Sequence, residues 1–162
     1  MPTARGPGDT AVRVQPRLSD MVDYQGTAFE VAGLIEYRLP ARTLRLARLL
    51  GGERVLYLEL PVSEVQDRAL VLAEIRALDL GAPPPATIYH GGESFLLRLS
   101  GVAEVVVSGE VPERPGGPCT LWRYRAAGDR FLQIEDWPDG IRMLEGASVH
   151  ESMIEVRPGP SS

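Results

Sequence analysis

Cysteine is almost absent from this sequence: Cys119 is the only one among 162 residues, which excludes an internal disulfide. Lysine and asparagine are missing altogether, and all 17 basic residues are arginine. Such a bias is typical of a GC-rich, bacterial coding sequence, so the arginine count alone does not indicate phosphate binding. No apolar run approaches the roughly 20 residues of a membrane-spanning helix, and we therefore expect no direct membrane span.

The N-terminal segment is not expected to act as a signal peptide. Residues Met1–Val14 contain no apolar core of the signal-peptide type, so we expect a cytoplasmic protein. A peripheral membrane role stays open, because a partner protein could supply the anchor.

A basic surface stripe is missing as well. The formal net charge is −5, and the arginines alternate with acidic residues instead of forming a block. Nucleic-acid binders usually carry a basic stripe that displaces counterions from phosphates. We therefore expect no nucleic-acid partner.

Residues that could hold a metal or a cofactor are sparse. His90, His150 and Cys119 lie far apart in the sequence, whereas a zinc site needs three or four converging ligands. Neither a GxGxxG nor a GxxxxGK[ST] motif lies between a strand and a helix, and no GxSxG motif occurs. We expect no metal and no cofactor, although a Ser–His–Asp arrangement of distant residues stays open.

The composition that is present predicts a folded core. Hydrophobic residues make up 44% and charged residues 24%, as in ordinary globular proteins. Residues 1–17 and 158–162 are rich in Pro, Gly, Ser or Arg, and we expect a flexible arm and a flexible tail there. Residues 18–157 are expected to form a single β-rich domain.

Most of this domain reads as short strands separated by turn residues. One helix is predicted at about 64–79, with Ser63 as its N-cap and Gln66 completing a capping box. Gly81 and the prolines at 83–85 end that helix and divide the domain.

An internal repeat is visible when the chain is shifted by 76 positions. Phe29–Leu60 then aligns with Val105–Asp136 without a gap, and seven of the 32 positions are identical, Gly33/Gly109 and Glu59/Glu135 among them. We predict a mainly β fold of two related antiparallel half-units, about 18–81 and 86–157, packed as a barrel or a sandwich. The alternative, that any two hairpins with a glycine turn look alike, stays open.

The hairpin pattern also predicts which side chains face the core. A three-residue loop at 127–129 sets Trp122 opposite Ile134 and Tyr124 opposite Leu132. The equivalent register in the first half sets Leu46 opposite Leu58. These residues and Leu56 are expected to point inward, whereas Arg123, Arg125 and Glu135 are expected to point outward.

The segments His90–Val111 and Leu121–Val156 resemble a bacterial family known as domain of unknown function 4178. The likeness is strongest over residues 86–157. It implies no established activity. Members of that family tend to be encoded beside polyamine-synthesis enzymes, small membrane proteins and membrane-stress proteins, which implies an accessory role.

Our first hypothesis is a non-enzymatic binding or adaptor module in such a membrane-stress or polyamine-linked system. Its partner would be another protein, and that protein could be membrane-associated. Tryptophan and arginine are enriched at binding hot spots, so the hairpin Thr120–Asp136 and the residue after it are the surface to test. The tentative binding residues are Arg123, Arg125, Glu135, Asp136 and Trp137.

Two alternatives remain. The first is a small-molecule-binding subunit or a small enzyme that uses Glu135 and Asp136, since paired carboxylates can perform acid–base chemistry. The second is a structural module that self-assembles through an exposed strand edge. The sequence leaves the oligomeric state open.

Overall fold

The computed structural model describes residues 15–61 and 67–160, nearly all of them in strands or tight turns. The predicted arm falls almost entirely outside the described residues, as does the capping box at Ser63 and Gln66. Within those residues no helix is long and apolar enough to cross a membrane. The strands are β1 (Met21–Tyr24), β2 (Thr27–Arg38), β3 (Thr43–Gly51), β4 (Arg54–Glu59), β5 (Arg68–Ile75), β6 (Thr87–His90), β7 (Glu93–Gly109), β8 (Gly117–Ala126), β9 (Arg130–Trp137), β10 (Gly140–His150) and β11 (Ile154–Arg157).

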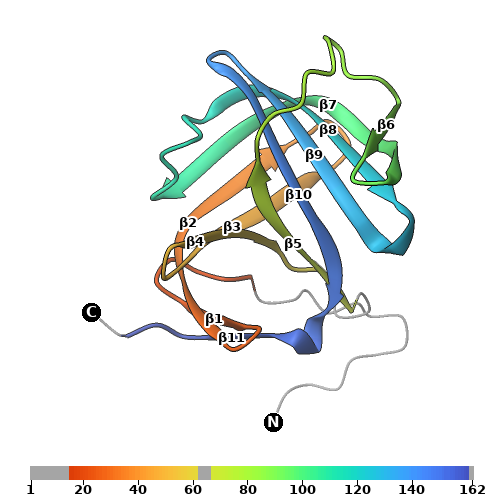
Figure 1. Cartoon of the computed structure of the whole chain (residues 1–162). Coiled ribbons are helices and arrows are strands. Elements are labelled where there is room, and N and C mark those ends of the chain that lie inside the picture. Colours follow the sequence, from red (N-terminus) through yellow and green to blue (C-terminus); the bar gives the residue numbers. More distant parts are fainter. Residues whose placement is uncertain (1–14, 62–66, 161–162) are drawn as a thin grey trace, which may run out of the picture.

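Eight of these strands close into an antiparallel barrel (Figure 1). Its order is β2-β3-β4-β5-β10-β9-β8-β7, and β7 pairs back with β2. The strands β1 and β11 extend the sheet at one end of the strand order, and β6 extends it at the other. The prediction of a mainly β fold is therefore confirmed, and the closed barrel replaces the open choice between barrel and sandwich.

Glycine allows the barrel to close at β2 and β7. The first half of β2 pairs with β1, and from Gly33 onward the strand pairs with β7 instead. A Cβ atom on Gly33 would lie 2.5 Å from the carbonyl oxygen of Glu110, and one on Gly109 would lie 2.6 Å from that of Ala32. The two backbones therefore approach more closely here than any larger residue would permit.

The barrel wall is buried on both faces for much of its length. Alternate residues point into the barrel, where Tyr37, Leu46 and Leu144 belong to one apolar cluster. Outside the wall, a second cluster joins β3, β4 and β5 to β1 and β2, and a third joins β8, β9 and β10 to β6. Side chains on both faces of a strand are therefore buried.

The predicted helix at 64–79 is wrong, because residues 68–75 form strand β5 between β4 and β10. Leu70 and Leu72 face the interior, and Ala69 packs in the cluster outside β3 and β4. A strand covered on both faces carries a continuous apolar run rather than an alternating one. Periodicity alone cannot distinguish such a run from a helix.

The second predicted hairpin register is correct and the first is shifted by one residue. Trp122 lies opposite Ile134 and Tyr124 opposite Leu132, as expected. The prediction that these four side chains point inward is wrong, because they pack outside the wall against β6. Leu58, however, lies opposite Ala47, because Gly51 pairs with Arg54 and leaves only two residues in the turn. Leu46 therefore points into the barrel as predicted, whereas Leu56 and Leu58 point outside the wall, and all three are buried.

The two ends of the barrel differ. At one end the connection between β7 and β8, residues 110–116, folds back and inserts the side chains of Val111 and Arg114 among interior residues. At the other end no such connection enters within the described part of the chain. There the beginnings of β3 and β5 and the end of β4 surround an open mouth.

Candidate functional site: a buried polar network beneath an arginine-lined mouth

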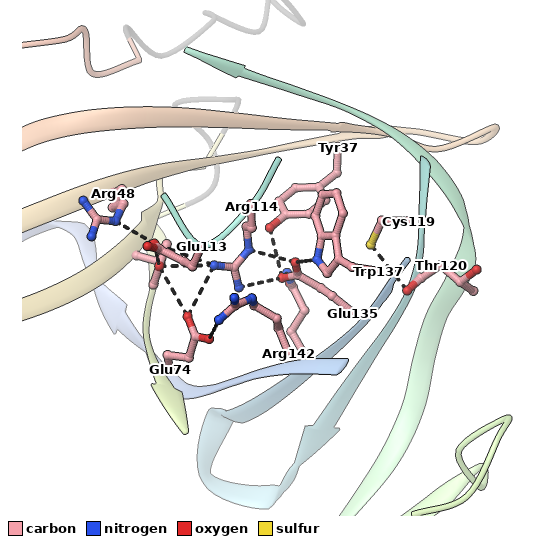
Figure 2. Close-up of polar contacts among 12 residues, drawn as sticks. Tyr37, Arg48, Glu74, Glu113, Arg114, Cys119, Thr120, Glu135, Trp137 and Arg142 are labelled. Carbon is pink, nitrogen blue, oxygen red and sulfur yellow. Dashed lines mark hydrogen bonds and ion pairs between the residues drawn. The ribbon is translucent and has the colours of Figure 1, made fainter. Parts of the chain in front are cut away.

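Glu135 is the centre of a polar network inside the barrel (Figure 2). Its carboxylate accepts hydrogen bonds from Arg114 Nε at 2.8 Å and Nη2 at 3.2 Å. It also accepts from the Tyr37 hydroxyl at 3.0 Å, from Gln133 Nε2 at 2.8 Å and from Trp137 Nε1 at 2.9 Å. A buried carboxylate with this many donors is fully compensated.

Arg114 is compensated in the same way on its other side. Its Nη1 donates to the Tyr57 hydroxyl at 3.2 Å and lies 3.4 Å from a carboxylate oxygen of Glu74. The guanidinium also stacks 4.9 Å above the Tyr57 ring. Tyr57 in turn donates to Glu113, which accepts from Arg48 Nε at 2.6 Å.

The titration behaviour of this network fits a structural role. Burial and the nearby charge of Glu135 hold the pKa of Tyr37 well above its usual value. Burial and a hydrogen bond to Glu113 likewise raise the pKa of Tyr57. Burial would raise the pKa of Glu113, but hydrogen bonds from Tyr57 and Arg48 bring it below its usual value. At neutral pH both tyrosines therefore keep their protons, and Glu113 is charged.

A second leg of the network leads toward the open mouth. Arg123 donates to Gln133 Oε1 from Nε at 3.1 Å and from Nη2 at 2.6 Å. It also donates to Glu59 from Nη1 at 3.1 Å. Because Gln133 donates to Glu135, polar contacts run without a break from the inserted Arg114 to the floor of the mouth.

The mouth itself holds a pocket of about 560 Å³. Apolar side chains such as Leu70, Leu99 and Phe131 form part of its wall. Charged side chains form the rest, with arginines in the majority. Within residues 15–61 and 67–160, the arginines of the lining are Arg42, Arg68, Arg98, Arg123 and Arg125, and its acidic residues are Glu59, Asp67 and Asp129.

These arginines fall into two groups. Arg123 is held by Glu59, and Arg125 forms an ion pair with Asp129. Arg68 lies 3.6 Å from Asp129 and donates to the carbonyl oxygen of Ser148 at 2.9 Å. Arg42 and Arg98, by contrast, are exposed and have no acidic partner among residues 15–61 and 67–160.

The structure separates the five sequence-predicted binding residues. Glu135, Trp137 and Arg123 were expected to be accessible, but their exposed fractions are 0%, 2% and 6%. Arg125 is exposed in the mouth, and Asp136 is exposed on the opposite face of β9. The prediction that Arg123 and Glu135 point outward is wrong, because polar partners from other strands and from the β7–β8 connection meet them inside the barrel.

Sequence reasoning missed the residues that matter most in this arrangement. Arg114 gave no local signal, since it lies in a loop and its partners are distant in sequence. Its identity with Arg38 in the internal repeat marked the position without indicating burial. Arg42 and Arg98 could not be selected from 17 arginines without knowing which strands converge at the mouth.

Cys119 and His150 do not line the pocket at the mouth. Burial, together with the charge of Glu135, raises the pKa of the Cys119 thiol to about 12, so it is a poor nucleophile. His150 Nδ1 lies 2.8 Å from Ser152 Oγ and accepts from Ser152 N at 3.1 Å, while its Nε2 lies 3.5 Å from Asp67. This exposed group caps a 3₁₀ turn, Glu151–Met153. Within the described residues no three potential ligands are placed to hold a metal ion.

Comparison with known proteins identifies one family. No curated protein and no solved structure matches the chain. The family described as domain of unknown function (DUF4178) matches residues 17–151. The resemblance noted in the second half is thus confirmed, and the match extends through the first half as well. Since it covers most of the sequence, the chain belongs to the DUF4178 family.

Proposed function

We propose that this domain is a non-enzymatic binding module whose ligand site is the open mouth of the barrel. The observation that carries the proposal is the contrast between the two ends of the interior. Around Glu135 every donor and acceptor is engaged within the chain, whereas at the mouth charged and apolar side chains converge on a pocket of about 560 Å³. Sites for small molecules commonly combine an apolar lining with a few converging polar groups.

An enzymatic use of Glu135 and Asp136 fits this geometry poorly. Successive residues of a strand point to opposite faces, so the two carboxylates do not share a substrate. Glu135 is enclosed, and Asp136 is exposed outside the barrel wall. Paired carboxylates need a common reacting atom to divide acid and base roles. The binding hypothesis is therefore preferred to the small enzyme.

The biological setting of the proposal comes from the family. Members of this family tend to be encoded beside membrane-stress and polyamine-synthesis proteins. That tendency favours an accessory role in such a system, in the cytoplasm and beside a protein partner. In this setting the mouth would receive a small molecule, or a side chain presented by the partner. The surplus of arginine there makes it unsuited to a polyamine itself, because like charges repel.

A blocked-mouth variant tests the proposal. Ser148 belongs to the lining and lies near the end of β10, so Ser148→Phe places a ring in the pocket. Ser100→Phe is the control, because it makes the same change at an exposed position of β7 that does not line the pocket. A fragment library is screened by amide chemical shifts in a ¹⁵N-labelled sample. We expect the amide shift changes to cluster at the mouth and to vanish only in Ser148→Phe. Shift changes that cluster elsewhere would contradict the proposal.

Self-assembly through a strand edge is a second candidate function. β6 and β11 end the strand order, each with one edge that pairs with no other described strand, and Tyr89 on β6 is 80% exposed. Such edges can pair with a second chain. Sedimentation over a range of protein concentrations tests this candidate: a monomer at every concentration contradicts it, and a reversible dimer that Tyr89→Lys abolishes supports it.

We also propose that β2–β5 and β7–β10 are duplicated half-units. Two inter-half pairings support this: Gly33 lies opposite Gly109, and Val71 opposite Ala147. Both pairs are separated by 76 positions, the shift that aligns the repeated segments, as expected for a two-fold relation between the halves. Family sequences test the idea, since duplication requires shared residues at this offset in distant members.

A further inference from the structure

We infer that the mouth of the barrel binds the anionic group of a small molecule, a carboxylate or a phosphate. This inference rests on the proposed function and names the chemical class of its ligand. Among the described residues that line the mouth, five are arginines and three carry carboxylates. This local surplus of positive charge stands out in a chain whose net charge is −5. An anion is thus attracted to a position where the protein has arranged a net positive field.

Arg42 and Arg98 are the residues that we assign to the anion. Each is exposed, each lines the pocket, and neither has an acidic partner in the described part of the chain. A guanidinium that is already paired must break an ion pair before it can bind a ligand, whereas these two need not. A guanidinium also matches the oxygens of a carboxylate or a phosphate with two parallel hydrogen bonds.

The remaining lining residues restrict the ligand further. Arg123 is 6% exposed and held by Glu59 and Gln133, so it forms a rigid floor rather than a free anchor. Leu99 and Phe131 offer apolar surface beside the charged groups. A ligand with an anionic head and a short apolar body satisfies both kinds of surface.

Four probes of equal chain length separate charge from apolar contact: hexanoate, hexyl phosphate, hexanol and hexylammonium. Each is titrated into the full chain at constant ionic strength, and amide shifts are followed. We expect saturable shifts at the mouth from the two anions only. The tighter of the two indicates whether a carboxylate or a phosphate is the natural group.

Variants assign the effect to the two arginines. Arg42→Gln and Arg98→Gln should each weaken anion binding about tenfold, the effect of one lost charge-assisted hydrogen bond. Arg76→Gln is the matched control, because Arg76 is exposed, lacks an acidic partner in the described residues and lies beyond the opposite end of β5. Circular dichroism verifies that all three variants fold.

The outcomes separate the two proposals. Equal binding of hexanol and the anions, or undiminished anion binding in the double variant, overturns the anion inference but leaves a ligand site at the mouth. No saturable anion shift also overturns the inference, and the fragment screen then decides whether the mouth binds anything. Shifts from hexylammonium alone would reverse the predicted charge of the ligand.

Discussion

Glu135 shows how a charged side chain can be stable where no water reaches it. Its exposed fraction is 0%, yet donors from Arg114, Tyr37, Gln133 and Trp137 occupy its oxygens. The cost of dehydrating a carboxylate is offset only when its partners are arranged in advance. Here five donor atoms supplied by β2, β9 and the β7–β8 connection meet that requirement.

We therefore expect Glu135→Gln to destabilise the fold by about 3–5 kcal/mol, because the guanidinium of Arg114 would remain buried without its counter-charge. The measurement is equilibrium unfolding in urea at pH 7. Asp136→Asn is the control, since this neighbour is exposed, and its effect should stay within about 0.5 kcal/mol. Equal midpoints for the two variants would contradict a central role for Glu135.

Cys119 gives a second prediction at the residue scale. The thiol is 2% exposed and its pKa is raised to about 12, so almost none of it is thiolate at pH 8. In native buffer, 5,5′-dithiobis(2-nitrobenzoate) should react with it far more slowly than in denaturant, where the usual pKa and full access return. Similar rates in both solutions would show that the thiol is accessible in the folded chain.

At the scale of elements, the connection between β7 and β8 depends on glycine in β2. The carbonyl oxygen of Glu110 and a methyl group of Val111 both lie 2.5 Å from the position of a Cβ on Gly33. A methyl group at residue 33 would push this connection away from the barrel and carry Arg114 with it. Packing of the wall and the buried polar network are thus coupled at one residue.

Gly33→Ala should consequently cost about 1–3 kcal/mol, the usual range for overpacking a filled site. Gly101→Ala is the matched control, because its Cβ would meet Leu39 Cδ2 at 3.4 Å and Pro40 Cδ at 3.9 Å, both ordinary contacts. Thermal unfolding followed by circular dichroism compares the two. If Gly33→Ala melts no earlier than Gly101→Ala, the close approach of β2 to residues 110–111 does not constrain the fold.

The elements also show where sequence reasoning succeeds. Alternation and a turn glycine placed Tyr124 opposite Leu132 correctly, because turn length fixes which residues pair. They assigned the wrong face, since Tyr124 and Leu132 pack outside the wall. The same logic failed for β5, which is apolar on both faces. It failed for Leu58 because a two-residue turn and a three-residue turn look alike when both faces of the wall are buried.

At the scale of the whole molecule, closure of the sheet decides what the sequence could not reveal. Charge normally marks the outer face of a strand, so Arg123 and Glu135 were assigned to solvent. In a closed barrel the inward residues of eight strands face one another, and charged groups can satisfy each other there. Closure of the barrel also forms the mouth, because Arg42 and Arg98 can line one pocket only when β3 and β7 belong to the same barrel.

The acid stability of the molecule tests this network as a unit. Hydrogen bonds from Tyr57 and Arg48 outweigh burial and keep the pKa of Glu113 below its unfolded value of 4.5. A carboxylate with a depressed folded pKa contributes stability that is complete above 4.5 and is lost as pH falls through the folded pKa. The free energy of unfolding, measured in urea between pH 7 and pH 3, should therefore decline on the acid side.

Glu113→Gln isolates the contribution of Glu113, because glutamine keeps the shape of glutamate but cannot titrate. The variant should be less stable than the parent at pH 7, where the parent gains from the charged group, and the difference should shrink toward pH 3. Glu53→Gln is the control, since Glu53 is exposed in the turn between β3 and β4. A difference in free energy of unfolding between Glu113→Gln and the parent that is the same at every pH would mean that Glu113 acts through packing rather than through its charge. The link between the inserted connection and the barrel interior would then have to be apolar.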